Sequence, residues 1–409
     1  MTKASRWLTT RQAADLLGVK PETVYAYVSR GALTRQRGED RRSSRFDRIE
    51  VERLAARHRR GGRAGALEVV IDTELTMLDP VGALYYRGHD AIELARTTHF
   101  EDVAELLWDV APAKVGRRRR EGDWQARAAA VRVARQAQNA LPASARPIDR
   151  MRVIVAALAA CDPLRDDRRP EAVVAATRGL IAATVDALPE RTPPQGSSIA
   201  SRLWSRLSDR PARRGEIRAL DAALVLLADH ELPASTLAAR VAASVWADPY
   251  LVVLTGLATG GGVLHAASVT TVETLVREAA EDGPSGVAQL VGDRLRGGER
   301  LPGFGHAVYT GRDPRADALL DLVRRAGPKS AVDASVAELL ALAGRYDGPA
   351  PNVDFGLGTY VVKAGLTPGS GEAIFLLARV VGMIAHALEE YPHRLRFRPR
   401  ALYTGPAPK

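Results

Sequence analysis

The first part of the chain alternates apolar and polar residues with the spacing of two short helices. Over residues 8–31 the apolar positions of the first helix lie on one face, and Thr9 or Thr10 can cap its start. Gly18 ends this helix, and Pro21 stands at the first position of a second one, where its missing amide hydrogen is not needed. The pattern therefore predicts a helix-turn-helix with a short turn after Gly18.

A hairpin and a third helix are predicted next. Residues 32–46 contain a Gly-Glu-Asp turn between basic flanks, which is typical of a β-hairpin wing. Residues 47–58 return to helical spacing, with apolar side chains available for packing. The Gly- and Arg-rich segment that follows indicates a linker at 61–66, after a small domain of residues 1–60.

Beyond the linker the apolar spacing is mostly helical as far as His265, with breaks near 115–122, 162–170 and 188–198. One run, Pro249–Val272, carries no charge other than a possible one on His265 and is long enough to span a bilayer. Its glycines and threonines indicate a broken, buried helix instead. We therefore expect no membrane-spanning segment.

Composition sets the size and the chemical environment of the protein. With 409 residues, 46% of them hydrophobic, the chain can bury a large core and divide into two or three domains. Aromatic residues are few, whereas alanine and leucine are abundant, which favours helices over sheet. Cys161 is the only cysteine, so an intrachain disulfide is excluded and a reducing cytoplasm is expected. The first residues are polar and charged, unlike a secretory signal.

The positive charge is concentrated at one end of the chain. Residues 1–64 contain 16 lysines and arginines against 7 acidic residues, and the remainder contains 42 against 41. Nearly all of the net charge of +10 therefore belongs to the first sixth of the sequence. This asymmetry indicates a small basic module joined to a nearly neutral one.

The segment Leu301–Leu320 combines a rigid loop, a histidine and an arginine. Its Pro-Gly-Phe-Gly sequence cannot continue a helix, and the glycines let backbone amides approach a ligand closely. His306 ends this loop, and Arg315 stands at the entrance to an apolar helix. Such an arrangement suits an anionic carbonyl compound. The alternative is a surface turn with an incidental histidine.

Further motifs stand before and after this segment in a characteristic order. Together they resemble the citrate synthase family, and the likeness extends from about Leu67 to about Pro406, roughly five-sixths of the chain. The motifs are DHELPAST at 229–236, LH at 264–265, PGFGHAVY at 302–309, DPRA at 313–316, NVDF at 352–355, AR at 378–379 and RPRALYTGP at 398–406.

This resemblance implies an all-α fold. A large helical domain would comprise residues near 66–265 and 359–405, and a smaller helical domain, near 266–358, would be inserted in it. In this family the small domain closes over the substrates, and two subunits form each pair of active sites. A homodimer is therefore expected.

The resemblance also implies a reaction, in which the methyl carbon of acetyl-CoA is joined to the ketone of oxaloacetate. Asp354 matches the family's base, His265 the donor that stabilises the enol, and His306 the acid that polarises the ketone. The thioester α-proton is far less acidic than the conjugate acid of aspartate, so a carboxylate base needs an assisted enolisation. His265 and Asp354 are therefore expected to act as a pair.

Four more residues match the family's ligands for oxaloacetate and citrate: His230, Arg315, Arg379 and Arg398, the last expected from the neighbouring subunit. Arginine suits this role because its planar fork meets a carboxylate through two hydrogen bonds. Arg379 also interrupts an apolar helix, where a charge without a partner is costly. The alternative for Arg379 is a structural ion pair.

The loop of Pro302, Gly303, Phe304 and Gly305 corresponds to the part of the family that wraps the CoA adenine with main-chain contacts. Acyl-CoA is thus a co-substrate, and we expect no resident cofactor. The sequence has no Walker-type loop and no GxGxxG after a strand. It also has no cluster of histidine, cysteine and carboxylates with metal-ligand spacing, so no metal is expected.

The sequence departs from the family at three places. Where the family commonly continues Gly-Gly-Ala-Asn-Glu after the first catalytic histidine, His265 is followed by Ala-Ala-Ser-Val. Thr310 stands where a lysine or arginine often contacts CoA phosphate, with Arg312 as a candidate replacement. Gly-Leu-Gly follows NVDF in place of Tyr-Ser-Gly. These changes leave the acid–base residues in place but leave the acyl-CoA and oxo-acid open.

The first domain, with its phrase AADLLGVKPETVYAYVSRGAL, resembles the winged helix-turn-helix of the MerR and excisionase type. In that family the second helix enters the major groove of duplex DNA. The alternative is a basic protein-interaction module. The candidates for contact with bases are Thr23, Tyr25, Ala26, Tyr27 and Arg30, and those for contact with phosphates are Arg35, Arg37, Arg41, Arg42 and Arg45.

Three functions follow from these observations. The first is a citrate synthase-like condensing enzyme with a DNA-binding appendage. The second is a transcription regulator that uses a synthase fold to sense CoA esters or oxo-acids. The third is a related enzyme with another substrate, such as a 2-methylcitrate synthase acting on propionyl-CoA.

Overall fold

The computed structural model describes residues 7–29, 33–37, 44–48, 50–51, 54, 70–79, 82–109, 124–345, 348–393, 395 and 397–398. The chain forms two compact units, Met1–Asp72 and Thr73–Lys409. The predicted linker at 61–66 lies outside the described residues. The division of the second unit into a large and a small domain stays a prediction.

The first unit contains the predicted helix-turn-helix. Helix α1 (Thr10–Leu17) is capped by Thr9, whose hydroxyl accepts from the Gln12 amide at 3.3 Å. Gly18 ends α1 with a φ of 67°, a conformation that glycine adopts without steric cost. Helix α2 (Pro21–Ser29) begins at the predicted proline. The sequence pattern therefore predicted this motif correctly.

The described part of the first unit also contains three strands, and most of the helix predicted over residues 47–58 lies outside the described residues. The strands are β1 (Trp7–Thr9), β2 (Arg35–Arg37) and β3 (Ser44–Asp47), and they pair antiparallel in the order β1-β3-β2. The predicted hairpin corresponds to β2 and β3, with Arg35 opposite Phe46, and its turn lies outside the described residues. The pairing of β1 with β3 was not predicted. Buried apolar residues beneath the sheet include Leu8, Val24 and Phe46.

The second unit begins with a small antiparallel sheet that the apolar pattern did not predict. Its strands are β4 (Thr76–Asp79), β5 (Ala83–Tyr86) and β6 (His89–Asp90). The buried Tyr86 hydroxyl lies 3.1 Å from the carbonyl oxygens of both Val225 and Asp229. This contact fixes the sheet against the segment that carries His230.

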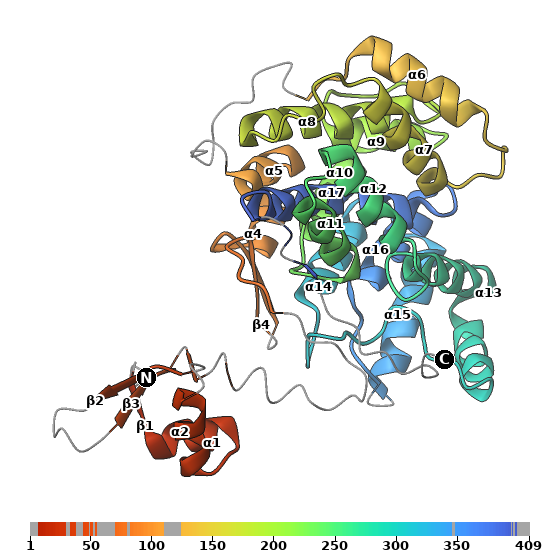
Figure 1. Ribbon diagram of the computed structural model, residues 1–409. Helices are drawn as coiled ribbons and strands as arrows, with labels where there is room; N and C mark the ends of the chain where they lie inside the picture. Colours follow the sequence, from red (N-terminus) through yellow and green to blue (C-terminus); the bar gives the residue numbers. More distant parts are fainter. Residues whose placement is uncertain are drawn as a thin grey trace, which may run out of the picture. The chain divides into compact units, whose positions relative to one another are not determined.

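The remainder of this unit is helical, as predicted (Figure 1). The helices before His265 are α4 (Ala91–Thr97), α5 (Phe100–Trp108), α6 (Ala128–Asn139), α7 (Pro147–Ala160), α8 (Pro170–Ala187), α9 (Ile199–Leu207), α10 (Arg214–Leu227), α11 (Ala234–Ser244) and α12 (Pro249–Gly260). The helices after it are α13 (Ser268–Arg296), α14 (Pro314–Arg325), α15 (Ala331–Arg345), α16 (Val353–Ala364) and α17 (Ser370–Glu390). Helix α13 is kinked at Gly283, immediately before Pro284.

Helix α17 packs against α5, α10, α11 and α12 and passes through the middle of the helical unit (Figure 1). It is the one helix of the described residues long and apolar enough to cross a membrane, but 94% of that stretch is buried in the protein, as in a core helix. The uncharged run Pro249–Val272 is divided between α12, a loop and the start of α13. The prediction of a broken helix there was correct.

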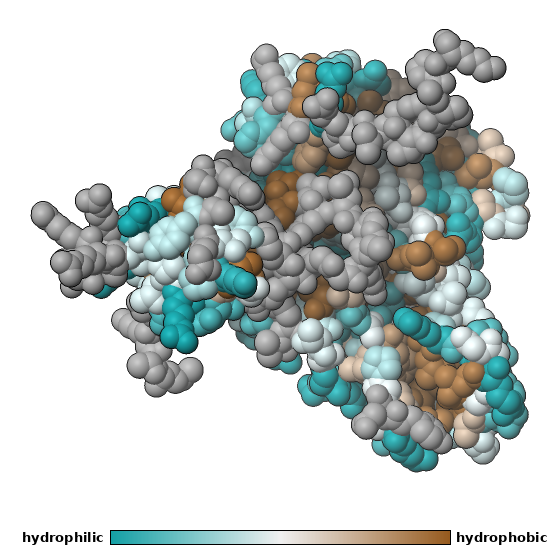
Figure 2. All heavy atoms as spheres, turned by 60° about the horizontal axis from the view of Figure 1, so that its bottom comes forward, coloured by the Kyte–Doolittle hydropathy of each residue, from teal (hydrophilic) through white to brown (hydrophobic). Residues whose placement is uncertain are grey.

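Buried apolar residues of the second unit form two clusters. The larger one includes α5, α7 to α12 and α17. The smaller one joins α13, α14 and α15 to Phe355 of α16. Both apolar and hydrophilic side chains reach the surface on the face shown in Figure 2.

Candidate active site

The loop that ends at His306 is tied to the start of α16. The Gly305 amide donates to the Ala350 carbonyl at 2.8 Å, and the Asn352 amide donates to the Gly303 carbonyl at 2.9 Å. The Asn352 side chain donates to the Gly305 carbonyl at 2.8 Å and caps α16. This single asparagine thus joins two predicted motifs that lie far apart in the sequence.

Both glycines of this loop are required by its shape. Gly303 and Gly305 have φ values of 82° and 84°, in the region that other residues rarely adopt. A Cβ on Gly303 would lie 2.9 Å from side-chain atoms of Phe355 and Val272. The Gly303 carbonyl and both the amide and the carbonyl of Gly305 already form hydrogen bonds within the protein. The predicted main-chain contacts with CoA therefore have to come from other amides and carbonyls of the loop.

Two buried aromatic side chains surround His306. Its ring centroid lies 5.2 Å from that of His230 and 4.7 Å from that of Tyr309. The Tyr309 hydroxyl also lies 3.2 Å from Nε2 of His230. Tyr309 was quoted in a motif but was not predicted as a site residue.

The hydrogen bonds of His306 determine which ring nitrogen carries the proton. Nδ1 accepts from the amides of Val308 and Tyr309 at 3.0 and 3.2 Å. Burial, assisted by the charge of Arg315, lowers the pKa of His306 to about 4, so the ring is neutral near pH 7. The neutral ring then carries its hydrogen on Nε2. His306 can therefore donate a hydrogen bond from Nε2.

Arg315 is held by Asp313, a residue that sequence analysis did not single out. The buried Asp313 carboxylate accepts from Nε and Nη2 of Arg315 at 2.9 and 2.8 Å, and from the Val353 amide at 2.9 Å. Asp313 thereby orients the arginine and connects it to α16. The aspartate of the Asp-Pro-Arg motif, which is the N-cap of α14, was the available signal.

His265 lies in the loop between α12 and α13. Its Nε2 is 2.7 Å from the hydroxyl of the buried Ser235, and its ring meets Phe375 edge-on at 5.8 Å. Burial, assisted by the charge of Arg379, lowers the pKa of His265 to about 4. Ser235 stands in the DHELPAST motif, but its contact with the histidine was not predicted.

Asp354 stands in the first turn of α16, where the amide groups at the helix start favour a negative charge. The Ser268 hydroxyl donates to its Oδ2 at 2.6 Å. Burial raises the pKa of Asp354 above its ordinary value, and the Ser268 hydrogen bond is the largest of the opposing effects, followed by Arg315.

Arg379 is 1% exposed in the middle of α17. Its Nε donates to the Leu227 carbonyl at 2.8 Å, and its guanidinium lies over the Phe375 ring at 5.0 Å. No carboxylate lies within 4 Å of it among the described residues; the charge of the buried Asp229 carboxylate acts on it from farther away and opposes the lowering of the Arg379 pKa by burial. Its charge lowers the pKa of both His230 and His265, although burial is the larger cause for each. One buried cation therefore helps to keep both histidines neutral.

Arg398 is exposed and has no hydrogen bond or ion pair within the described part of its own chain.

The structure brings some of the predicted site residues together. His306 contacts both His230 and Arg315, whereas His265 and Asp354 each contact a serine. Arg312, the candidate for CoA phosphate, is exposed and bonded to Asp317 at 2.6 Å.

In the first unit, the candidate DNA contacts are only partly described. Arg30, Arg41 and Arg42 lie outside the described residues, as do the side chains of Ala26 and Arg37. Thr23, Tyr27 and Arg45 are half-buried, and Arg35 is exposed. Tyr25 is 40% exposed, but its hydroxyl is 3.2 Å from those of both Thr10 and Ser44. Tyr25 therefore also has a structural role, which sequence analysis did not predict.

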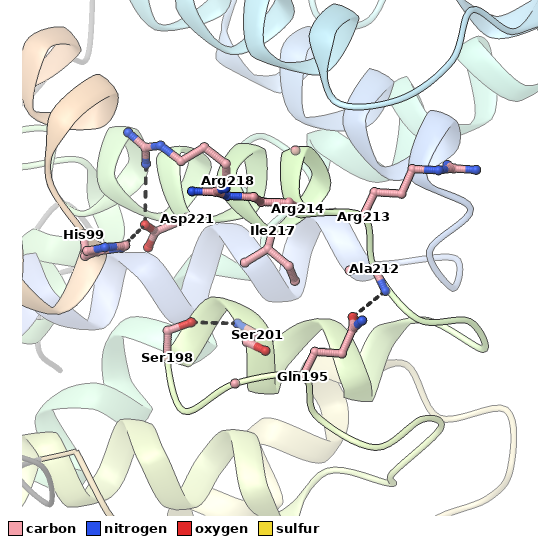
Figure 3. Close-up of a pocket in the computed structure, with 12 residues that line it drawn as sticks. His99, Gln195, Ser198, Ser201, Ala212, Arg213, Arg214, Ile217, Arg218 and Asp221 are labelled. Carbon is pink, nitrogen blue, oxygen red and sulfur yellow. Dashed lines mark hydrogen bonds and ion pairs between the residues drawn. The ribbon is translucent and has the colours of Figure 1, made fainter.

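A separate cavity lies between the segment 195–201 and the start of α10 (Figure 3). Figure 3 shows His99 and Arg218 directed at the same carboxylate, that of Asp221. The two contacts measure 2.7 Å from His99 and 3.5 Å from Arg218. The cavity contains none of the residues predicted for catalysis. The described residues contain no group of three histidine, cysteine or carboxylate side chains able to hold a metal ion.

Comparisons with known proteins cover both units. A family model described as citrate synthase, C-terminal domain, matches residues 66–400, and one described as helix-turn-helix domain matches residues 7–59. The citrate synthase of Haloferax volcanii is 31% identical, over 82% of this chain and 94% of its own. The citrate/2-methylcitrate synthase of Bacillus subtilis is 29% identical, over 83% of this chain and 95% of its own.

A solved structure supports the same comparison. It is the ternary complex of carboxymethyl coenzyme A and oxaloacetate with citrate synthase from the thermophilic archaeon Thermoplasma acidophilum. The match has a TM-score of 0.69 and 28% identity, and it covers 83% of this chain and 95% of the other.

Proposed function

The chain belongs to the citrate synthase family, and we propose that it condenses acetyl-CoA with oxaloacetate and water to give citrate and CoA. The family and the fold identify an enzyme that condenses an acyl-CoA with oxaloacetate. The observation that best supports the proposal is the buried Arg379, which has no carboxylate within 4 Å among the described residues and whose charge lowers the pKa of both His230 and His265. A dicarboxylate substrate would compensate this charge.

In the proposed reaction the Asp354 carboxylate removes a proton from the methyl carbon of acetyl-CoA. We assign the donor of the 2.7 Å contact between Ser235 and Nε2 of His265 to the serine hydroxyl; the ring then carries its hydrogen on Nδ1 and donates it to the thioester oxygen. This hydrogen bond stabilises the enol that forms. The pair overcomes the low acidity of the methyl group, which neither residue could do alone.

The enol carbon then attacks the ketone carbon of oxaloacetate. As this bond forms, negative charge develops on the ketone oxygen, and the Nε2 hydrogen of His306 and the Arg315 guanidinium stabilise it. Water subsequently hydrolyses the thioester, which releases citrate and the CoA thiol. His230, Arg315 and Arg379 orient the carboxylates of oxaloacetate in this proposal.

We also propose a homodimer in the cytoplasm, with Arg398 reaching the active site of the neighbouring subunit. The exposure of Arg398 supports this role. Apolar side chains exposed on α11 and α12 and between them, namely Val241, Val245, Trp246 and Leu251, supply a surface that a second subunit would bury. The single cysteine, Cys161, is unpaired, in keeping with a reducing compartment.

The proposed role of the first unit is to bind duplex DNA. The helix-turn-helix match, the β2–β3 wing and the basic charge of this unit support it. The departures after His265 favour a second candidate, a regulator that binds acyl-CoA or oxo-acids without turnover. The match to a citrate/2-methylcitrate synthase favours a third, in which propionyl-CoA is the acyl donor.

The test is release of the CoA thiol by the purified full chain, with oxaloacetate and either acetyl-CoA or propionyl-CoA. Higher kcat/KM with acetyl-CoA and formation of citrate support the proposal. A preference for propionyl-CoA supports the 2-methylcitrate alternative. Binding of oxaloacetate by calorimetry, with no thiol released from either thioester, supports the sensor and overturns the enzyme.

A further inference from the structure

Ser268 connects the two residues proposed to enolise acetyl-CoA. It is the first residue of α13, and its main-chain amide donates to the His265 carbonyl at 2.8 Å. Its side chain reaches α16, where the hydroxyl donates to Oδ2 of Asp354 at 2.6 Å. One serine therefore contacts both the proposed donor and the proposed base.

The contact leaves the two carboxylate oxygens of Asp354 in different surroundings. Oδ2 accepts from Ser268, whereas Oδ1 accepts no hydrogen bond from the described residues. The Asp354 amide donates to the Asn352 side chain at 3.0 Å, which fixes the backbone but not the side chain. The orientation of the carboxylate thus depends on Ser268.

The Ser268 hydroxyl does not serve as a cap of its own helix, α13. No side chain caps the start of α13, because its N-cap is Ala267. The Ser268 hydroxyl bonds across to α16, 86 positions away in the sequence.

We propose that Ser268 is a positioning residue for the base: it holds Oδ2 of Asp354, so that Oδ1 takes the methyl proton of the acyl-CoA. This inference rests on the proposed condensation. A hydrogen bond to the ionised carboxylate also favours the charged form that acts as a base. Ser268 thereby opposes the effect of burial, which favours the protonated form.

The test compares the full-length protein with Ser268→Ala, Ser268→Thr and Thr274→Ala. Threonine keeps a hydroxyl at the same branch point, and Thr274 is an exposed residue of α13 whose hydroxyl bonds only within that helix. We expect Ser268→Ala to lower kcat roughly tenfold through misplacement of the base. The acid limb of kcat/KM should move to higher pH, while affinity for oxaloacetate is unchanged. Ser268→Thr should restore both, and Thr274→Ala should resemble wild type.

A second measurement does not depend on turnover. Carbon-13 NMR of the Asp354 carboxyl, assigned with Asp354→Asn, follows its titration in the free protein, and Ser268→Ala should move it to higher pH. The inference is overturned if this titration is the same in Ser268→Ala and wild type. If the wild-type protein releases no CoA thiol but Ser268→Ala still shifts the Asp354 titration to higher pH, the proposed function is contradicted, whereas the hydrogen bond from Ser268 to Asp354 is supported. An active, folded Ser268→Ala enzyme with unchanged kcat and pH profile contradicts the positioning role alone.

Discussion

Nη2 of Arg315 lies 3.3 Å from Nε2 of His306. Since Nδ1 of His306 accepts two main-chain hydrogen bonds, Nε2 carries the hydrogen, and both facing atoms are donors. Two donors cannot bond each other, but both can bond an acceptor placed beside them. The pair therefore forms a preorganised place for an oxygen that gains negative charge, which is what the ketone of oxaloacetate does in the proposed reaction.

Loss of either enolising residue should abolish turnover without abolishing substrate binding. We expect Asp354→Asn and His265→Ala each to lower kcat by orders of magnitude, because the proton would lose its acceptor or the enol its donor. Affinity for oxaloacetate, measured by calorimetry, should remain near wild type, since neither residue is proposed to hold its carboxylates. A large loss of that affinity would contradict the assigned roles.

Arg379 should be essential for affinity and dispensable for stability. We expect Arg379→Met to raise the KM for oxaloacetate roughly a hundredfold or more, because a carboxylate in the site would lose its partner. The ligand-free variant should melt at the same temperature as wild type or higher, since a buried charge with no carboxylate within 4 Å among the described residues is costly, and burial lowers the pKa of Arg379. Arg312→Gln, which removes an exposed ion pair, is the control and should change neither quantity. A lower melting temperature for Arg379→Met would indicate a structural role.

Stability should fall as the pH drops from about 6.5 to about 4. The pKa of His265 and of His306 is lowered to about 4 in the folded protein. Unfolded histidines take up protons below about 6.5, so in this window the unfolded state binds more protons and is favoured. Comparing His306→Gln with wild type isolates the contribution of His306 to this pH dependence. The variant should lose less stability than wild type between about pH 6.5 and about pH 4. Urea unfolding at several pH values measures the free energy of unfolding of both proteins. If this free energy falls equally with pH in wild type and in His306→Gln, the lowered pKa assigned to His306 is contradicted.

Arg398 should serve the site of the neighbouring subunit. Arg398→Ala and Asp354→Asn are each expected to be inactive alone, but subunits mixed under exchange should form some sites that contain both native residues. Thiol release should then return in part. No recovery despite demonstrated exchange, or a fully active monomer by light scattering, would contradict the arrangement.

The first unit should bind duplex DNA and be removable. We expect binding to weaken steeply with salt, since each neutralised phosphate contributes roughly 0.9 to the log–log slope. A chain starting near Gly61 should keep its thiol-release activity. Fluorescence anisotropy with duplex DNA at several salt concentrations, for the full and the shortened chain, tests both points. A soluble but inactive shortened chain, with no DNA binding by the full chain at low salt, would indicate a structural module instead.

The sequence by itself determined the elements that depend on neighbouring residues. Thr9, Gly18 and Pro21 cap, end and start helices through contacts within a few positions, so their pattern predicted the helix-turn-helix correctly. The resemblance likewise identified the family, because motif order along the chain is a property of the sequence. It also led to the catalytic roles proposed for His265, His306 and Asp354.

Only the tertiary structure decided which groups orient those residues. Ser235 lies 30 positions from His265, Ser268 lies 86 from Asp354, and Asp313 lies 40 from the Val353 amide that it accepts from. The spacing of apolar residues contains no information on such contacts, because side chains distant in sequence meet only when the helices pack. The same holds for the pairing of strand β1 with β3 and for Arg379, whose burial depends on the elements packed around α17.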